Sequence, residues 1–224
     1  MTSIPSEFRR LVSNGKFHKP TTGICPGFKQ ANMVMVPKQH ASFFERVIKD
    51  NYGPMPLLEY SENCNDIIHE IPRYAIHIAG KTTQTDKLDR KKLRIDDGYV
   101  YFLLGCSFSF EGYLLERNIP VRNIEQNTNV TMYDTNIVLD SPVKANMVVS
   151  MRPIPKSDLK MTFNLSSILK DCHAAPIGIG SAWARENLVQ KDDFSSCDYG
   201  ETVRFHQGDV PVFWCCGVTG YVQI

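Results

Sequence analysis

The sequence predicts an α/β protein, and three observations support this class. Apolar stretches of strand length alternate along the chain with amphipathic stretches of helix length, which favours a sheet with helices packed on its faces. The 224 residues are enough for one elaborated domain or two small ones with a substantial core. Hydrophobic residues make up 42% and charged residues 22%, an ordinary globular composition, and the net charge of +1 gives no general attraction to nucleic acid or an anionic membrane.

The N-terminal part of the chain contains the first helices and strands. A short helix is predicted over 6–13, where Gly15 follows the last turn. A turn-rich stretch leads into a strand at 32–36, and residues 40–53 have the periodicity of an amphipathic helix. We expect a short strand at 56–60, and alternation predicts another at 73–78.

The middle of the chain contains its most apolar predicted strand. Residues 81–97 are rich in charge and are interpreted as a solvated helix or loop. The stretch 99–104 is continuously apolar, as expected of a strand covered on both faces. A helix is predicted to follow from about 108 to 117.

The C-terminal part repeats the alternation after an irregular stretch. Residues 119–139 are polar and are interpreted as irregular. A strand at 146–151 is expected to end at the RPIP motif, followed by a helix over 156–171. A further helix is predicted at 181–190 and a last strand at 210–216.

Polar side chains follow the apolar strand at 99–104. In open α/β sheets, ligands bind beyond the carboxyl ends of the strands, where backbone N–H groups and helix N-termini attract anions. Cys106, Ser107 and Ser109 occupy that position. Glu111 falls in the first turn of the next helix, where it either complements the helix dipole or acts as an acid or base in a pocket.

Other polar residues allow both a structural and a functional interpretation. Arg152 follows a buried strand, where a guanidinium can grip a carboxylate with two hydrogen bonds or form a structural ion pair. His173, beside a glycine-rich turn, either packs there or takes part in catalysis. Tyr133, Thr135 and Asn136 are uncharged hydrogen-bonding groups suited to orienting a small polar ligand.

The sequence predicts neither a metal site nor a bound cofactor. It has no closely spaced Cys/His pairs, no Walker loop and no dinucleotide fingerprint. The partner expected is a small molecule, without nucleic acid or membrane, and the number of subunits is left open. Seven cysteines without a CxxC motif or an apparent secretion signal favour free thiols in a reducing compartment. We expect the cytoplasm, with the mitochondrial matrix as the alternative.

Several motifs occur together along nearly the whole chain. They are PTTGICPGFKQAN (20–32), PLLE (56–59), IPRY (71–74), LLGCSFSFE (103–111), PVRNIEQNTNVTMYDTN (120–136), VVSMRPIP (148–155), HAAPIGIG (173–180) and VPVFWCCGVT (210–219). On these motifs the chain resembles the D-glutamate cyclase family, whose members also carry the hydro-lyase label. The resemblance implies a three-layer αβα sandwich with a smaller two-layer α/β subdomain. We expect residues 1–118 and 200–224 to form the main domain and 119–199 the smaller one.

The activity that the resemblance implies is carbon–oxygen lysis, with conversion of D-glutamate to 5-oxo-D-proline and water. Metal-free general acid–base catalysis and an oxyanion pocket would accomplish this reaction. The expected catalytic residues are Glu111 as proton donor, His173 as base and, in a rival covalent mechanism, Cys106 as nucleophile. The expected substrate-binding residues are Ser107, Ser109, Arg152, Tyr133, Asn136, Asn32 and Arg73.

The chain departs from the family pattern at several places. It has HAAP where the family has HGAP, and it places Thr131 and Asp134 where the family has proline and arginine. It ends at GVTGYVQI, where family members continue. Two alternatives therefore stay open: a hydro-lyase acting on another small carboxylic acid, and a non-catalytic amino-acid-binding module that has lost the C-terminal tail.

Overall fold

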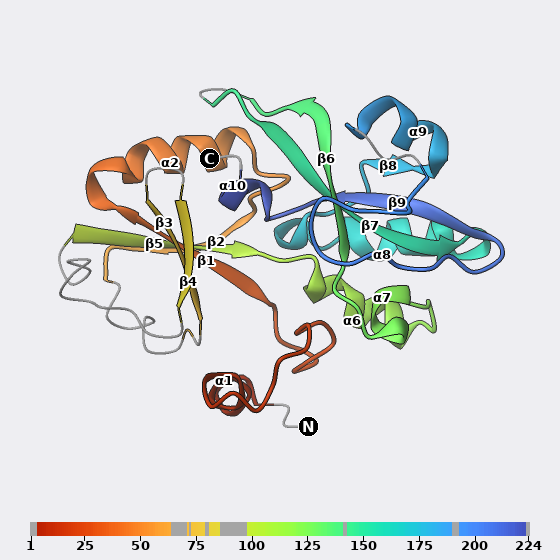
Figure 1. Cartoon of the computed structure of the whole chain (residues 1–224), viewed down its shortest axis with the longest axis horizontal. Helices are drawn as coiled ribbons and strands as arrows, with labels where there is room; N and C mark the ends of the chain where they lie inside the picture. Colours follow the sequence, from red (N-terminus) through yellow and green to blue (C-terminus); the bar gives the residue numbers. More distant parts are fainter. Residues whose placement is uncertain are drawn as a thin grey trace.

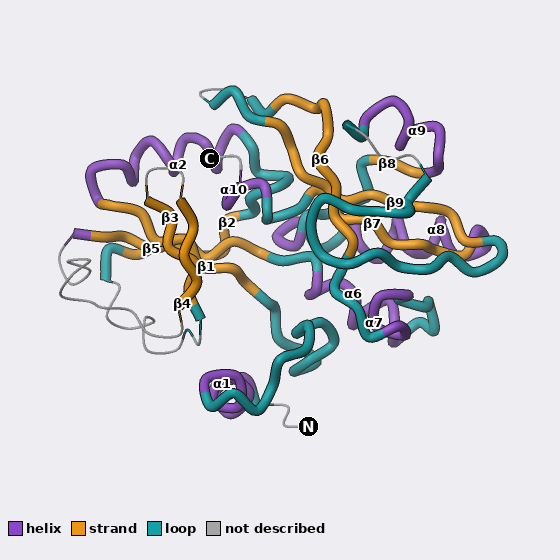
Figure 2. Tube along the Cα trace, viewed as in Figure 1, coloured by secondary structure: helices purple, strands orange, loops and turns teal. Residues whose placement is uncertain are grey.

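The computed structural model contains helices and antiparallel sheets arranged in two lobes. It describes residues 4–63, 71, 73–78, 81–85, 98–140, 143–189 and 193–222. Figure 1 shows the N-terminal lobe on the left and the C-terminal lobe on the right, and Figure 2 shows helices and strands in both. The predicted α/β class is confirmed. The layering that the resemblance implies stays a prediction.

The N-terminal lobe is built on a three-stranded antiparallel sheet with the order β1-β5-β2 and a separate hairpin of β3 and β4. Its elements are α1 (Pro5–Ser13), β1 (Ala31–Pro37), the short 3-10 helix η1 (Lys38–His40), α2 (Ala41–Asp50), β2 (Leu57–Ser61), β3 (Tyr74–Ile78), β4 (Lys81–Thr85) and β5 (Tyr99–Gly105).

The two faces of this sheet have different neighbours. Val34 and Val36 of β1 pack with Phe102 of β5 against α2. Met33 and Met35 alternate with them and therefore lie on the opposite face, in a cluster that includes Tyr74 of the hairpin. The hairpin thus contributes to the side of the sheet that α2 leaves open.

The C-terminal lobe is built on a four-stranded antiparallel sheet with the order β6-β7-β9-β8. Its elements are α6 (Phe108–Glu116), α7 (Arg122–Gln126), β6 (Thr131–Val138), β7 (Asn146–Pro155), η2 (Lys156–Asp158), α8 (Leu159–Ser167), η3 (Lys170–Cys172), β8 (Gly178–Ile179), α9 (Gly180–Asn187) and β9 (Asp209–Cys215). The last helix, α10 (Thr219–Val222), follows β9 and lies against Met55 and Leu104 of the N-terminal lobe.

Apolar residues cover both faces of the four-stranded sheet. Tyr133 and Phe213 belong to a cluster that includes residues of α9. Phe110 of α6 and Trp214 of β9 belong to another cluster, which α8 also joins. Strand β9 pairs with β7 and β8 rather than with β5. A division of the chain into two domains remains a proposal, and this pairing favours grouping β9 with the C-terminal lobe.

Two stretches expected to lack strands contain them. The stretch 119–139 was expected to be irregular because it is polar, but it forms α7 and β6. Its buried threonines hydrogen-bond to carbonyls of other segments: Thr131 donates to the Glu201 carbonyl at 2.7 Å and Thr135 to the Met147 carbonyl at 2.6 Å. Residues 81–85 form β4, whereas 86–97 and the turn at Gly80 lie outside the described residues.

Strand β7 is longer than the sequence indicates. It was expected to end before Arg152, but it continues to Pro155, and Pro153 lies opposite Pro211 of β9. The pairing of β6 with β7 reaches Met151 and no further. Beyond that residue β7 is flanked on one side alone, and a proline without an N–H group is tolerated there.

Candidate functional site

The centre of the candidate site is a buried ion pair between α6 and β7. Arg152 donates to Glu111 Oε1 from Nε at 2.6 Å, and its Nη2 lies 2.5 Å from the same oxygen. Both side chains have 0% exposed surface. A buried charge is costly unless it is paired and hydrogen-bonded, so each residue depends on the other.

Two hydroxyls and two aromatic rings complete the surroundings of Arg152. Its Nη1 donates to Ser150 Oγ and its Nη2 to Ser107 Oγ, each at 3.0 Å. The guanidinium carbon lies 4.7 Å from the ring centre of Phe110 and 5.4 Å from that of Trp214. These contacts hold the guanidinium in one orientation and aim one of its N–H groups at Ser107.

The second oxygen of Glu111 differs from the first. Burial raises the pKa of Glu111, although the charge of Arg152 and the Asn123 amide act against this shift. Glu111 Oε2 has no hydrogen-bond partner among the described residues. Burial therefore gives the carboxyl group an increased tendency to carry a proton.

A close backbone contact fixes the turn between β5 and α6. A Cβ atom on Gly105 would lie 1.7 Å from the Asp171 carbonyl oxygen, so η3 can approach only a glycine. The Cys106 N–H donates to the Gln30 carbonyl at 3.1 Å.

Burial raises the pKa of the Cys106 thiol to about 12, although an N–H group of Phe108 opposes the shift. The thiol is therefore protonated at neutral pH.

His173 follows η3 and lies almost completely buried. Its backbone has a left-handed φ of 76°, and Nδ1 lies 2.9 Å from the Gly53 carbonyl oxygen. Because a carbonyl can only accept, Nδ1 carries the hydrogen and Nε2 keeps a lone pair. Burial lowers the pKa of His173 to about 4, and the charge of Arg152 acts in the same direction against the effect of Gly53. The imidazole is therefore neutral at pH 7.

The turn after β9 brings several of these groups together. A Cβ atom on Gly217 would lie 3.5 Å from Asn32 Nδ2, 3.8 Å from the Gly105 carbonyl and 3.9 Å from His173 Cε1. Tyr221 of α10 interacts electrostatically with Cys106, and burial raises its pKa. The two lobes thus meet at a junction, which is formed by Asn32, Gly105, His173, Gly217 and Tyr221.

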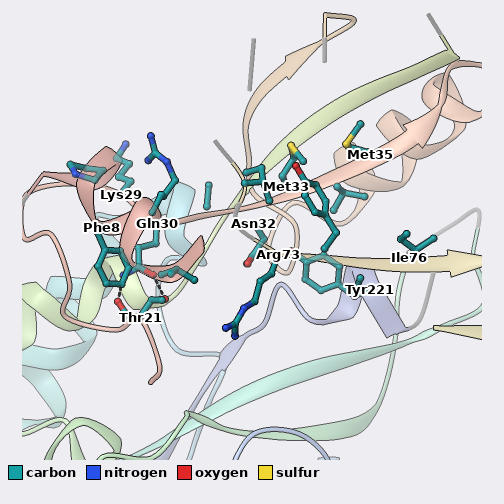
Figure 3. Close-up of a pocket in the computed structure, with 18 of the residues that line it drawn as sticks. Phe8, Thr21, Lys29, Gln30, Asn32, Met33, Met35, Arg73, Ile76 and Tyr221 are labelled. Atoms are coloured by element: carbon teal, nitrogen blue, oxygen red, sulfur yellow. Dashed lines mark hydrogen bonds between the residues drawn. The ribbon is translucent and has the colours of Figure 1, made fainter. Parts of the chain in front are cut away.

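A cavity of about 810 Å³ opens beside this junction. It runs along β1 and includes Asn32, Arg73 and Tyr221 among its lining residues. Figure 3 shows Asn32 and Arg73 in the middle of this view, with Phe8 and Thr21 toward one end and Ile76 toward the other. Asn32 and Tyr221 therefore belong both to the cavity and to the junction.

Comparison with known proteins identifies the family. A sequence model of the D-glutamate cyclase family matches residues 100–224. A protein of Clostridium beijerinckii named "Putative hydro-lyase" is 38% identical over 231 residues, covering 96% of this chain and 84% of the relative. The chain belongs to the D-glutamate cyclase family. Hydro-lyases named in the same way occur in Natranaerobius thermophilus (41% identity, 96% of this chain and 84% of the relative) and Bordetella pertussis (39% identity, 92% and 76%).

In this member of the D-glutamate cyclase family, most of the expected site residues lie near the junction. Glu111, Arg152 and Ser107 form one hydrogen-bonded cluster. Four more of the expected site residues, Cys106, His173, Asn32 and Arg73, lie around the junction or line the cavity.

Three of the expected site residues, Ser109, Tyr133 and Asn136, contact other parts of the protein instead. Ser109 Oγ accepts from the Gln30 N–H at 2.9 Å and so ties α6 to the start of β1. Tyr133 lies opposite Val149 and therefore points away from the face of Ser150 and Arg152, into the core near α9. Asn136 is exposed and donates to the Glu186 carbonyl at 2.8 Å.

The structure adds residues that the sequence did not single out. Ser150 contacts Arg152, Gly53 accepts from His173, and Tyr221 lines the cavity. Ser150 could have been found from its i, i+2 relation to Arg152, because alternate strand residues share a face. Nothing in the local sequence distinguishes Gly53 or Tyr221, since both positions depend on contacts between distant segments.

The described residues contain no group of three histidine, cysteine or carboxylate side chains that could hold a metal ion. Among these same residues, no helix is long and apolar enough to cross a membrane.

Proposed function

We propose that this chain is a lyase that cyclises D-glutamate to 5-oxo-D-proline with release of water. Membership of the D-glutamate cyclase family supports the reaction class. The observation that carries the proposal is the buried Glu111–Arg152–Ser107 cluster, which lies at the turn after β5 and whose Arg152 charge acts on His173. This arrangement offers an acid, a hydroxyl donor and a neutral base at one junction.

The proton balance defines what the site must do. The substrate ammonium carries three hydrogens and the lactam nitrogen of the product keeps one. The amine forms a bond to the γ-carboxyl carbon, the bond from that carbon to one oxygen breaks, and this oxygen leaves as water. Both hydrogens of the water therefore originate from the ammonium, and the protein acts as a relay. Because the two reacting groups are tethered, the entropic cost of bringing them together is small.

Glu111 and Ser107 are the proposed proton donor and oxyanion stabiliser. The raised pKa of Glu111 gives its carboxyl group an increased tendency to hold a proton that it can donate. Ser107 Oγ accepts a hydrogen bond from Arg152, so its own hydrogen is available to the developing oxyanion. Arg152 donates hydrogen bonds to both Glu111 and Ser107, and we propose it as a positioning residue that acts through these two groups.

His173 is the proposed base. Its neutral imidazole and the lone pair on Nε2 allow it to accept the ammonium proton at pH 7. A pKa of about 4 makes this nitrogen a weak base, so a proton that it takes from the ammonium passes on at once to the leaving oxygen in the proposed relay. Asn32 and Arg73 are the proposed contacts for the α-carboxylate, because they line the cavity beside the junction.

The covalent alternative through Cys106 is less well supported. A thiol with a pKa of about 12 is a poor nucleophile toward an ionised carboxylate. We expect Cys106→Ser and Cys106→Ala to keep turnover near that of the wild type. Loss of turnover in both variants, with the fold retained, would support the covalent mechanism instead.

The direct experiment is chiral chromatography of the product after incubation with D-glutamate, L-glutamate or an N-acetylated analogue. We expect 5-oxo-D-proline from D-glutamate and loss of turnover by at least about 100-fold in Ser107→Ala and His173→Asn, the usual scale of a general acid–base contribution. Binding of D-glutamate without turnover by the wild type would contradict the proposal and favour a binding module.

The hydro-lyase name of the relatives supports a second candidate substrate class, another small carboxylic acid. Dehydration of such an acid would use the same acid and base without the amine. We place either reaction in the cytoplasm, since the cysteines that the structure describes are free thiols.

A further inference from the structure

The cavity beside β1 has features that a site for glutamate alone does not require. It lies on the side of the three-stranded sheet that faces the β3–β4 hairpin, and residues of α1 also line it. Its volume of about 810 Å³ is in the upper part of the roughly 300–1,000 Å³ range of sites for drug-sized ligands. Glutamate is much smaller than such ligands and would leave most of the space unused.

One wall of the cavity is apolar over a length of several residues. Met33 and Met35 of β1 lie on it together with Tyr99 of β5, and Tyr74 and Ile76 of the hairpin also line it. Methionine side chains adapt to irregular partners and make favourable contacts with flexible apolar groups. This wall is suited to an alkyl or aromatic group rather than to a second charged group.

The described charged residues that line the cavity all have one sign. Arg9, Lys29 and Arg73 line it, and no aspartate or glutamate occurs among the described lining residues. Lys29 forms an ion pair with Asp171. Arg73 Nη2 lies 3.2 Å from His18 Nδ1, but a guanidinium has five N–H donors and can hold a carboxylate together with other contacts.

We propose that this cavity binds a carboxylate that carries an apolar tail of several carbons. The carboxylate lies at Arg73, and the tail extends along Met33 and Met35 under the hairpin. Because Asn32 and Tyr221 belong both to this cavity and to the junction, the ligand lies next to the candidate active site. Arg73 is also the proposed contact for the α-carboxylate of glutamate, so the two ligands would compete for it, but binding of the apolar carboxylate does not require turnover of D-glutamate.

Titration calorimetry with octanoate, octylammonium and acetate tests this site without any turnover. Octanoate and octylammonium share a tail and differ in charge, whereas acetate retains the carboxylate without the tail. We expect octanoate to bind more tightly than either, and we expect each buried methylene to increase the affinity roughly fourfold. Equal binding of octanoate and octylammonium, or of octanoate and acetate, would overturn the proposal.

Variants locate the ligand within the cavity. Arg73→Met should weaken octanoate binding by about tenfold or more, because it removes a charged hydrogen-bond donor, while Arg73→Lys should retain part of the affinity. Met35→Gln, which keeps the side-chain length, should reduce the difference in affinity between octanoate and acetate. Arg46→Met on the exposed side of α2 is the matched control and should bind as the wild type does. Unchanged octanoate binding in Arg73→Met and Met35→Gln would exclude this cavity, whatever the result with D-glutamate.

Discussion

At the scale of single residues, the ion pair of Glu111 and Arg152 is the contact with the largest expected effect on stability. Removing one member of a buried pair leaves the other charge uncompensated, which costs about 3–5 kcal/mol. We therefore expect Glu111→Gln to lower the free energy of unfolding by about that amount at pH 8, as measured in urea.

The matched control removes both charges. Glu111→Gln combined with Arg152→Met should recover most of the lost stability, because no unpaired charge then remains in the core. A loss below about 1 kcal/mol in the single variant would show that Glu111 is not ionised at pH 8.

His173 gives a prediction on pH dependence. Its pKa is about 4 in the folded protein and near 6.5 in the unfolded chain, so the unfolded state binds a proton first as the pH falls. Stability is unaffected above pH 6.5 and decreases between pH 6.5 and 4, by roughly 3 kcal/mol in total.

His173→Asn isolates this contribution. Asparagine tolerates the left-handed backbone and can donate to the Gly53 carbonyl, but it does not titrate. The difference in unfolding free energy between wild type and variant should therefore change over this pH range and stay constant above it. A constant difference down to pH 4 would contradict the low pKa.

At the scale of elements, the approach of η3 to the end of β5 positions His173. Gly105→Ala would drive a Cβ into the Asp171 carbonyl, and neither backbone can yield without displacing the residues that follow. We expect a loss of at least about 2 kcal/mol in unfolding free energy, together with loss of turnover.

Gly112 within α6 is the matched control for this substitution. Apart from the backbone of its own helix and its two neighbours in the chain, no described residue has an atom within 4 Å of a Cβ at that position, and alanine is the better helix former. Gly112→Ala should therefore stabilise the protein by about 0.5–1 kcal/mol. Thermal unfolding of both variants, together with product assays, distinguishes a local clash from a general intolerance of alanine.

Much of the element structure could be predicted from local patterns. The apolar run at 99–104 and the periodicity at 40–53 correspond to β5 and α2. Strand β6 could not be predicted in this way, because Thr131 and Thr135 are polar yet buried through hydrogen bonds to distant carbonyls. Composition records the polarity of a side chain but not the partner that tertiary structure provides.

The candidate site shows the same limit. Glu111 and Arg152 stood out because each allowed an ionic interpretation, but their mutual pairing joins residues 41 positions apart. Tyr133 is grouped with Asn136 in the sequence-based prediction because the two residues are close in sequence. Strand alternation and the register with β7 direct Tyr133 to the face of the sheet opposite to that of Arg152. Register between strands is set by long-range contacts, and a single sequence gives little information on it.

At the scale of the whole molecule, contacts between the lobes suggest that they unfold together. Asn51 at the end of α2 donates to the Asp140 carbonyl at 3.0 Å and accepts from the Asp140 N–H at 2.8 Å. His173 bonds to Gly53, and Ser109 bonds to Gln30. Gly220 of α10 also lies against Met55 and Leu104 of the N-terminal lobe, so the chain returns to this lobe after β9.

Two optical probes can test this cooperativity. Both tryptophans, Trp183 on α9 and Trp214 on β9, lie in the C-terminal lobe, whereas far-ultraviolet circular dichroism reports the helices and strands of both lobes. If the lobes form one cooperative unit, urea transitions followed by fluorescence and by dichroism should coincide. Asn51→Ala should shift both midpoints together, with a loss of about 1–3 kcal/mol, because it leaves the Asp140 backbone groups without their partner. Separate transitions, or a shift of the dichroism midpoint alone, would show that the lobes fold independently and that the junction forms only after each lobe is complete.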